Sequence, residues 1–172
     1  IDFEILEQEE LVGVFLDVCR TYVVQAFCQS QPFKEEEWLK EEWLTRLTHI
    51  WVNSQKDNEY FPMHVHSKCA LSSVMYLKIP EYLPCRKIGD GIGKDGAIEF
   101  SNNSSQEKIW GVPTLSIYPQ VGDFFIFPAT QLHQAYPFRT LDGEGERRSV
   151  SFNAEFTSKS EQDNLKKQQK KH

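Results

Sequence analysis

Apolar residues follow a helical period at the start of the chain and a strand period after it. In "ELVGVFLDVCRTYVVQAF" (residues 10–27), one stripe contains Leu11, Val14, Phe15, Val18, Tyr22 and Ala26. This spacing predicts an amphipathic helix. The acidic run in "QSQPFKEEEW" (residues 29–38) indicates the start of a second helix. The apolar residues of that second helix are Trp38, Leu39, Trp43, Leu44 and Leu47. We expect both helices to pack on a sheet as structural support.

From about residue 49 the chain changes to short β-rich runs separated by turn signals. The runs are "HIWVN", "ALSSVMYLKIP", "GAIEF", "TLSIYP", "DFFIFP" and "RRSVSFNAEF". Gly, Asp and Asn gather in the connections "QKDNEY", "GDGIGKDG" and "LDGEGE". Many short strands of this kind predict a sandwich, jelly roll or small barrel. We therefore expect a helical layer over residues 1–48, a β-domain over residues 49–157, and a basic flexible tail over residues 158–172.

Composition narrows the class of protein. The chain has 172 residues, of which 40% are hydrophobic and 13% aromatic, and this fits one globular domain with an extension. The formal net charge of −6 disfavours nucleic-acid binding. We find no apolar run of the roughly 18 residues that a membrane helix needs, so no membrane partner is expected. The sequence leaves the oligomeric state open.

Four cysteines bear on the compartment in which the protein works. They are Cys19, Cys28, Cys69 and Cys85, and they form no C-x-x-C pair and no zinc-knuckle spacing. We expect reduced, structural thiols and a cytoplasmic location.

Three histidines form the first part of a candidate site. In "YFPMHVHSKCALSSVMYL", His64 and His66 are two residues apart, so on a strand both imidazoles point to the same face. The alternative is an exposed strand face with two solvated histidines. His133 favours a metal site, because the break after "VGDFFIFP" lets the next extended run return it toward the pair. Three neutral imidazoles suit Fe, Zn, Cu or Ni. His49 is interpreted as an ordinary helix-end residue.

A strand near the end of the β-domain contains the second part of the candidate site. In "ERRSVSFNAEF", one face carries Arg147, Ser149, Ser151 and Asn153, and Arg148 lies on the other face. A guanidinium beside a serine hydroxyl can bind a carboxylate with several hydrogen bonds. The alternative is an arginine in a surface salt bridge. The strand register decides which of Arg147 and Arg148 points inward.

In this order, "HVH", His133 and "RRSVS" resemble the signature of the Fe(II)/2-oxoglutarate-dependent oxygenases. The chain is similar to a branch of this superfamily found in phage and marine bacterial genomes. The similar segments are "WVN" (51–53), "LSSVMYLKIP" (71–80), "GAIEF" (96–100), "GDFFIFPATQLHQAYP" (122–137) and "RRSVSFN" (147–153). The resemblance covers roughly residues 50–155. It implies a mainly β protein with N-terminal helices on a double-stranded β-helix, the cupin-like jelly roll.

The resemblance also implies an enzyme that uses Fe(II), 2-oxoglutarate and O2, usually to hydroxylate a C–H bond. The implied metal ligands are His64, His66 and His133. The implied 2-oxoglutarate-binding residues are Arg147, Ser149 and Tyr76, and the candidate lining residues are Asn53 and Asn153. Nothing in the sequence identifies the substrate that is oxidised.

One position departs from the family pattern, because His66 stands where most such oxygenases have a carboxylate. We favour three histidine ligands over the alternative, in which Asp57, Glu59 or Asp123 joins the metal shell. Two other functions compete with the oxygenase. One is a cupin-type three-histidine protein, either a dioxygenase without 2-oxoglutarate or a zinc hydrolase. The other is a non-catalytic jelly-roll binding module. Arg147 discriminates between them, because only the 2-oxoglutarate enzyme needs it.

Overall fold

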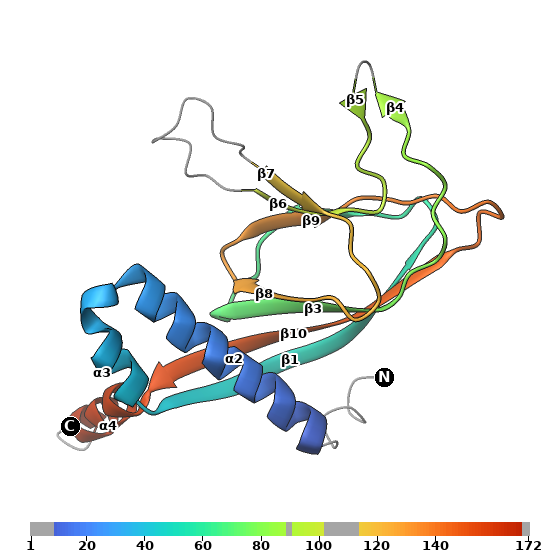
Figure 1. The fold of residues 1–172 in the computed structure, drawn as a ribbon. Helices are drawn as coiled ribbons and strands as arrows, with labels where there is room; N and C mark the ends of the chain where they lie inside the picture. Colours follow the sequence, from blue (N-terminus) through green and yellow to red (C-terminus); the bar gives the residue numbers. More distant parts are fainter. Residues whose placement is uncertain (1–8, 89–90, 102–113, 170–172) are drawn as a thin grey trace.

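Two four-stranded antiparallel sheets face each other in the computed structural model, which describes residues 9–88, 91–101 and 114–169 (Figure 1). The large sheet has the order β1 (Trp43–Lys56), β10 (Glu146–Ser158), β3 (Leu71–Lys78) and β8 (Phe124–Pro128). The small sheet has the order β2 (Phe61–His64), β9 (Leu132–Ala135), β6 (Ile98–Ser101) and β7 (Thr114–Ile117). A short hairpin pairs β4 (Lys87–Ile88) with β5 (Gly91–Ile92). This architecture confirms the predicted jelly roll with N-terminal helices.

Alternation along β10 divides the large sheet into an outer apolar face and an inner polar face. Val150, Phe152 and Ala154 are buried in the outer core, whereas Arg147, Ser149 and Ser151 face the space between the sheets. The register pairs Asn53 of β1 with Ser149, and Ser149 with Tyr76 of β3. Polar residues of three adjacent strands therefore meet on the inner face.

Helix α2 (Glu9–Ser30) covers the outer face of the large sheet (Figure 1). Phe15, Cys19 and Val23 recur at helical spacing, are almost fully buried, and pack in one cluster with Phe152. The rings of Phe15 and Phe152 lie 4.9 Å apart. Burial of each large apolar side chain of this kind stabilises the fold by about 1.5–3 kcal/mol. The first predicted helix thus has the structural role expected of it.

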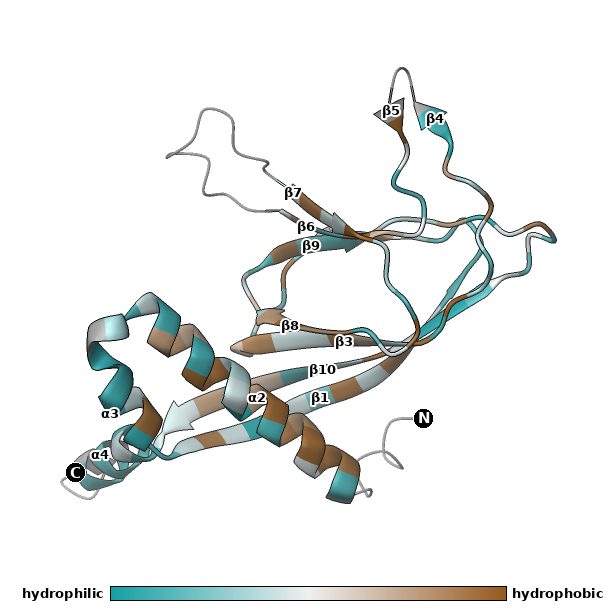
Figure 2. Ribbon diagram, viewed as in Figure 1, coloured by the Kyte–Doolittle hydropathy of each residue, from teal (hydrophilic) through white to brown (hydrophobic). Residues whose placement is uncertain are grey.

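The same helix corrects an expectation about membrane segments. Residues Glu10–Ser30 are long and apolar enough to cross a membrane by length and composition alone, and Figure 2 shows hydrophobic bands along α2 that alternate with hydrophilic ones. The helix carries Asp17 and Arg20 on its exposed side, which divide the apolar run. A helix that packs on a core meets the same criteria, and one face of α2 packs on the large sheet.

The structure differs from the sequence prediction after the acidic run. A short 3-10 turn, η1 (Pro32–Lys34), leads into α3 (Glu35–Lys40), and β1 begins at Trp43. The second helix is therefore shorter than predicted, and Trp43, Leu44 and Leu47 lie on a strand. Pairing with β10 along the length of β1 outweighs the local helical pattern. The ring of Trp43 stacks on Phe27 of α2 at 5.0 Å.

Three further predictions are corrected at the two ends of the structure. His49 is an exposed residue within β1 and not a helix end, and β1 runs across the predicted limit at residue 48. At the other end, α4 (Lys159–Gln169) replaces most of the predicted flexible tail. The helix begins where the Ser160 hydroxyl donates to the Glu41 carboxylate at 2.9 Å and the Lys159 N–H donates to the Glu42 carbonyl.

Candidate metal centre

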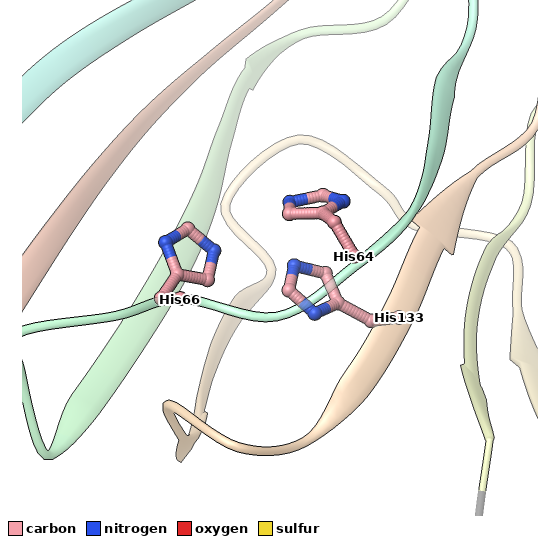
Figure 3. A group of neighbouring side chains, drawn as sticks. All are labelled: His64, His66 and His133. Carbon is pink, nitrogen blue, oxygen red and sulfur yellow. The ribbon is translucent and has the colours of Figure 1, made fainter.

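The jelly roll brings the three histidines together at the edge of the small sheet (Figure 3). His64 ends β2 and lies directly opposite His133 of the neighbouring strand β9, and His66 follows two residues later. One nitrogen of each ring lies within 4.8 Å of one nitrogen of the other two. The ring centroids of His64 and His133 are 4.3 Å apart. Three imidazoles at this separation can share one metal ion.

Backbone carbonyls fix the orientation of two of the rings. The Nδ1 of His64 lies 2.7 Å from the carbonyl oxygen of Pro62, and the Nδ1 of His133 lies 2.9 Å from that of Gln131. A carbonyl can only accept, so the Nδ1 of each ring is the donor, and in the neutral ring the lone pair for a metal is on Nε2. Hydrogen bonding of the second ring nitrogen is typical of histidines that bind metals.

The surroundings also favour the neutral rings that metals require. Burial lowers the pKa of His133 to about 4, and the neighbouring rings of His64 and His66 act in the same direction. Burial, followed by the proximity of His64, lowers the pKa of His66. Both rings are therefore unprotonated near neutral pH.

The three carboxylates considered from the sequence have other partners. The Asp57 carboxylate accepts hydrogen bonds from the backbone N–H of Thr140 at 2.5 Å and from its hydroxyl at 2.9 Å. Glu59 accepts from the backbone of Lys56 at 2.7 Å, and Asp123 accepts from the backbone of Gln120 at 2.8 Å. None of the three lines the cavity beside the histidines. Within the described part of the chain, the three-histidine set is the arrangement that the geometry supports.

A cavity of about 210 Å³ between the sheets joins the histidines to the polar face of the large sheet. Predicted residues that line it are His64, His66, His133, Arg147, Ser149, Tyr76 and Asn53. Asn153, also predicted as a lining residue, does not line it. Its side chain lies two residues further along β10 than Ser151, and its Oδ1 is buried with no hydrogen-bond partner among the residues that the structure describes.

Sequence reasoning missed two lining residues on β1. Trp51 lines the cavity with its ring 5.9 Å from that of His66. Gln55 also lines the cavity and is only 3% exposed. Both occupy the same strand parity as Asn53, which was the signal that could have found them.

Arg147 lies at the buried end of the cavity, with 3% of its surface exposed. Its Nη1 donates to the Gly96 carbonyl at 2.7 Å, and its Nη2 donates to Gln55 Oε1 at 2.5 Å and to the Tyr136 carbonyl at 3.2 Å. Among the residues that the structure describes, no Asp or Glu forms a salt bridge with this guanidinium. A buried cation without an anionic partner is costly, so this site favours an anion.

The neighbours of Arg147 suit a carboxylate ligand. Ser149 lies two residues along the same face, and Tyr76 is paired with it across the strands. Burial raises the pKa of Tyr76 to about 12, although the charge of Arg147 acts in the opposite direction. The phenol therefore keeps its proton and can donate a hydrogen bond. Arg148, by contrast, is exposed and forms a salt bridge with Glu146 at 2.9 Å.

Sequence comparison places this site within a known family. Residues 49–153 match the sequence profile of the family described as "Putative 2OG-Fe(II) oxygenase", and the match covers more than half of the chain. The matched range contains all three histidines and Arg147. No curated protein sequence is significantly similar to this chain.

Several solved structures are distantly similar. An oxidoreductase of the 2OG-Fe(II) oxygenase family from Burkholderia pseudomallei is 13% identical with a TM-score of 0.44, over 75% of this chain and 55% of that protein. HygX from Streptomyces hygroscopicus, solved with nickel and 2-oxoglutarate bound, is 11% identical with a TM-score of 0.43, over 64% of this chain and 56% of HygX. An RmlC-like cupin from Desulfovibrio desulfuricans is 14% identical with a TM-score of 0.34, over 65% of this chain and 82% of that protein. The chain thus spans little more than half the length of the Burkholderia protein and of HygX.

Proposed function

Since this chain belongs to the 2OG-Fe(II) oxygenase family, we propose that it is an Fe(II)- and 2-oxoglutarate-dependent oxygenase, with hydroxylation of a substrate C–H bond as its reaction. His64, His66 and His133 are the proposed metal ligands, and O2 is the proposed second co-substrate. When bound, the iron would supply the activation of O2 that is coupled to decarboxylation of 2-oxoglutarate.

One observation carries the proposal. The cavity has three imidazoles at one end and, at the other, a buried guanidinium to which the described residues offer no acidic partner. A zinc hydrolase or a plain three-histidine dioxygenase needs the first feature and has no use for the second. A dicarboxylate that chelates a metal with its keto-acid end needs both.

The charges of the site support the same co-substrate. Three neutral histidines add no negative charge to a divalent metal, unlike the two histidines and one carboxylate of most such oxygenases. The two carboxylates of 2-oxoglutarate would balance the metal at one end and Arg147 at the other. Hydroxyl groups of Ser149 and Tyr76 are placed to donate to the carboxylate held by Arg147.

The test is an anaerobic titration of Fe(II) into the protein with and without 2-oxoglutarate. We expect a visible metal-to-ligand charge-transfer band only when both are present. Arg147→Met should weaken 2-oxoglutarate binding on the order of 100-fold, because it removes charge-assisted hydrogen bonds to the carboxylate. The matched control is Arg148→Met, which removes the exposed neighbour and should leave the band unchanged. Bound metal without any band would favour the cupin or zinc-hydrolase function.

We also propose that the protein works in a reducing, cytoplasmic compartment without nucleic acid or membrane partners. All four cysteines are unpaired, although Cys28, Cys69 and Cys85 are only partly buried. The net charge of −6 opposes phosphate binding. The apolar face of α2 that contains Phe15 and Val23 is already occupied by the large sheet.

A further inference from the structure

The side chain of Gln55 accepts a hydrogen bond from the guanidinium of Arg147. It lies on β1 directly opposite Arg147 of β10 and is 3% exposed. Its Oε1 accepts from Arg147 Nη2 at 2.5 Å. The other two partners of the guanidinium, Gly96 and Tyr136, contribute backbone carbonyls. Gln55 is therefore the partner of Arg147 that a mutation can change most directly.

The amide of Gln55 can take only one orientation. Its Nε2 donates to the carbonyl of Glu59 at 2.5 Å and lies 3.4 Å from the carbonyl of Tyr136. Both carbonyls can only accept, and the guanidinium can only donate, so a flipped amide would lose all these bonds. The surrounding backbone thus directs a neutral oxygen at Arg147 and holds it there.

Because Gln55 is neutral, it leaves the positive charge of Arg147 unbalanced, which an acidic residue would not do. Glutamate at this position would neutralise Arg147 inside the protein and repel a second carboxylate arriving from the cavity. Glutamine keeps the same hydrogen bond and leaves the full positive charge available to a ligand.

We propose that Gln55 is a positioning residue that determines the preference of the site for a keto dicarboxylate over a keto monocarboxylate. It does so by orienting Arg147 without neutralising it. This inference rests on the proposed function, because it assumes that the distal carboxylate of 2-oxoglutarate binds at Arg147.

The experiment compares two keto acids on the Fe(II)-loaded protein under anaerobic conditions. 2-Oxoglutarate carries the distal carboxylate and pyruvate lacks it, and the charge-transfer band reports the binding of each. Gln55→Glu should weaken 2-oxoglutarate binding on the order of 100-fold, the effect expected of two like charges about 5 Å apart in a partly buried site. Pyruvate binding and Fe(II) binding should change by less than about threefold, because neither involves Arg147.

A second variant separates charge from hydrogen bonding. Gln55→Met removes the hydrogen bonds without adding a charge, so it should weaken 2-oxoglutarate binding by about tenfold and leave pyruvate binding unchanged. The control Gln120→Glu adds the same charge at an exposed turn and should alter neither ligand. It also tests whether net charge alone explains the effect.

The outcomes separate the possible failures. Equal losses of 2-oxoglutarate and pyruvate binding in both Gln55 variants would show a merely structural role and overturn this inference. Unchanged 2-oxoglutarate binding in both variants would overturn it as well. If the native protein binds Fe(II) but not 2-oxoglutarate, the proposed function itself fails, and the inference fails with it.

Discussion

Gly96 offers a direct test of how the backbone supports Arg147. Its carbonyl accepts the hydrogen bond from Arg147 Nη1, and its φ of +83° lies in the left-handed region. A Cβ at this position would lie 2.5 Å from Cε2 of Tyr82. The Tyr82 ring stacks at 4.9 Å on the fully buried Phe138, and moving it away from a Cβ at residue 96 would disturb this contact. Gly96→Ala therefore combines backbone strain with a steric clash.

The two contributions can be estimated separately. A non-glycine residue in the left-handed region costs about 1–2 kcal/mol, and overpacking of a buried contact costs about 1–3 kcal/mol. We expect Gly96→Ala to lower the free energy of unfolding by about 2–5 kcal/mol. Gly143 provides the matched control, because its φ is +72° and a Cβ there would meet nothing within 4 Å. Gly143→Ala should cost only about 1–2 kcal/mol.

Urea unfolding of the native protein and the two variants measures the loss in free energy of unfolding that each substitution causes. The difference between the variants isolates the contact of residue 96 with Tyr82. Binding of 2-oxoglutarate should weaken in Gly96→Ala, whose altered backbone carries the carbonyl that holds Arg147, and stay unchanged in Gly143→Ala. Equal destabilisation by both substitutions would refute the packing argument.

Two further predictions concern the metal ligands and the charged groups of the small sheet. His133→Ala should weaken the binding of Co(II) or Zn(II), measured by calorimetry, at least about 100-fold. The control His49→Ala, on an exposed part of β1, should leave metal binding unchanged. Equal metal affinity in the two variants would contradict the proposed ligand set. Burial opposes ionisation of Glu99, but hydrogen bonds from Lys94, Ser116 and two other side chains outweigh it and lower the pKa to about 2. Because the folded-state pKa is depressed, the stability from ionised Glu99 is present above the ordinary pKa of 4.5 and is lost as the pH falls toward 2. Glu99→Gln should therefore flatten the acid side of the stability profile in urea titrations, and an unchanged profile would count against this role.

The cluster of three histidines could be predicted from the sequence because it depends on strand parity and chain order. "HVH" directs two rings to one face, and the break after "VGDFFIFP" returns His133 beside them. The residues alone do not show that Arg147 points inward, because only the pairing of β10 with β1 and β3 fixes the register. The family pattern supplied that register where the residues alone left it open.

Other features depend on contacts that no local pattern contains. Trp43 and Leu47 fit a helix by spacing, and the long pairing with β10 places them on a strand. Gln55 looks like an ordinary polar residue in the sequence, and its importance arises from Arg147, 92 residues away. The partners of Asp57 and Asp123, which remove them from the metal shell, are likewise visible only in the fold.

The pairing of β2 with β9 has a mechanical consequence. β2 has four residues, lies at the edge of the small sheet, and carries His64 opposite His133. A metal ion bound between these two rings would act as a cross-strand staple at the edge where a sheet is easiest to peel open or to join to another chain. Metal binding would then stabilise the edge of the sheet in addition to preparing the site for catalysis. It would also link the edge strand β2 to β9, so that this edge strand is held more firmly when the metal is bound.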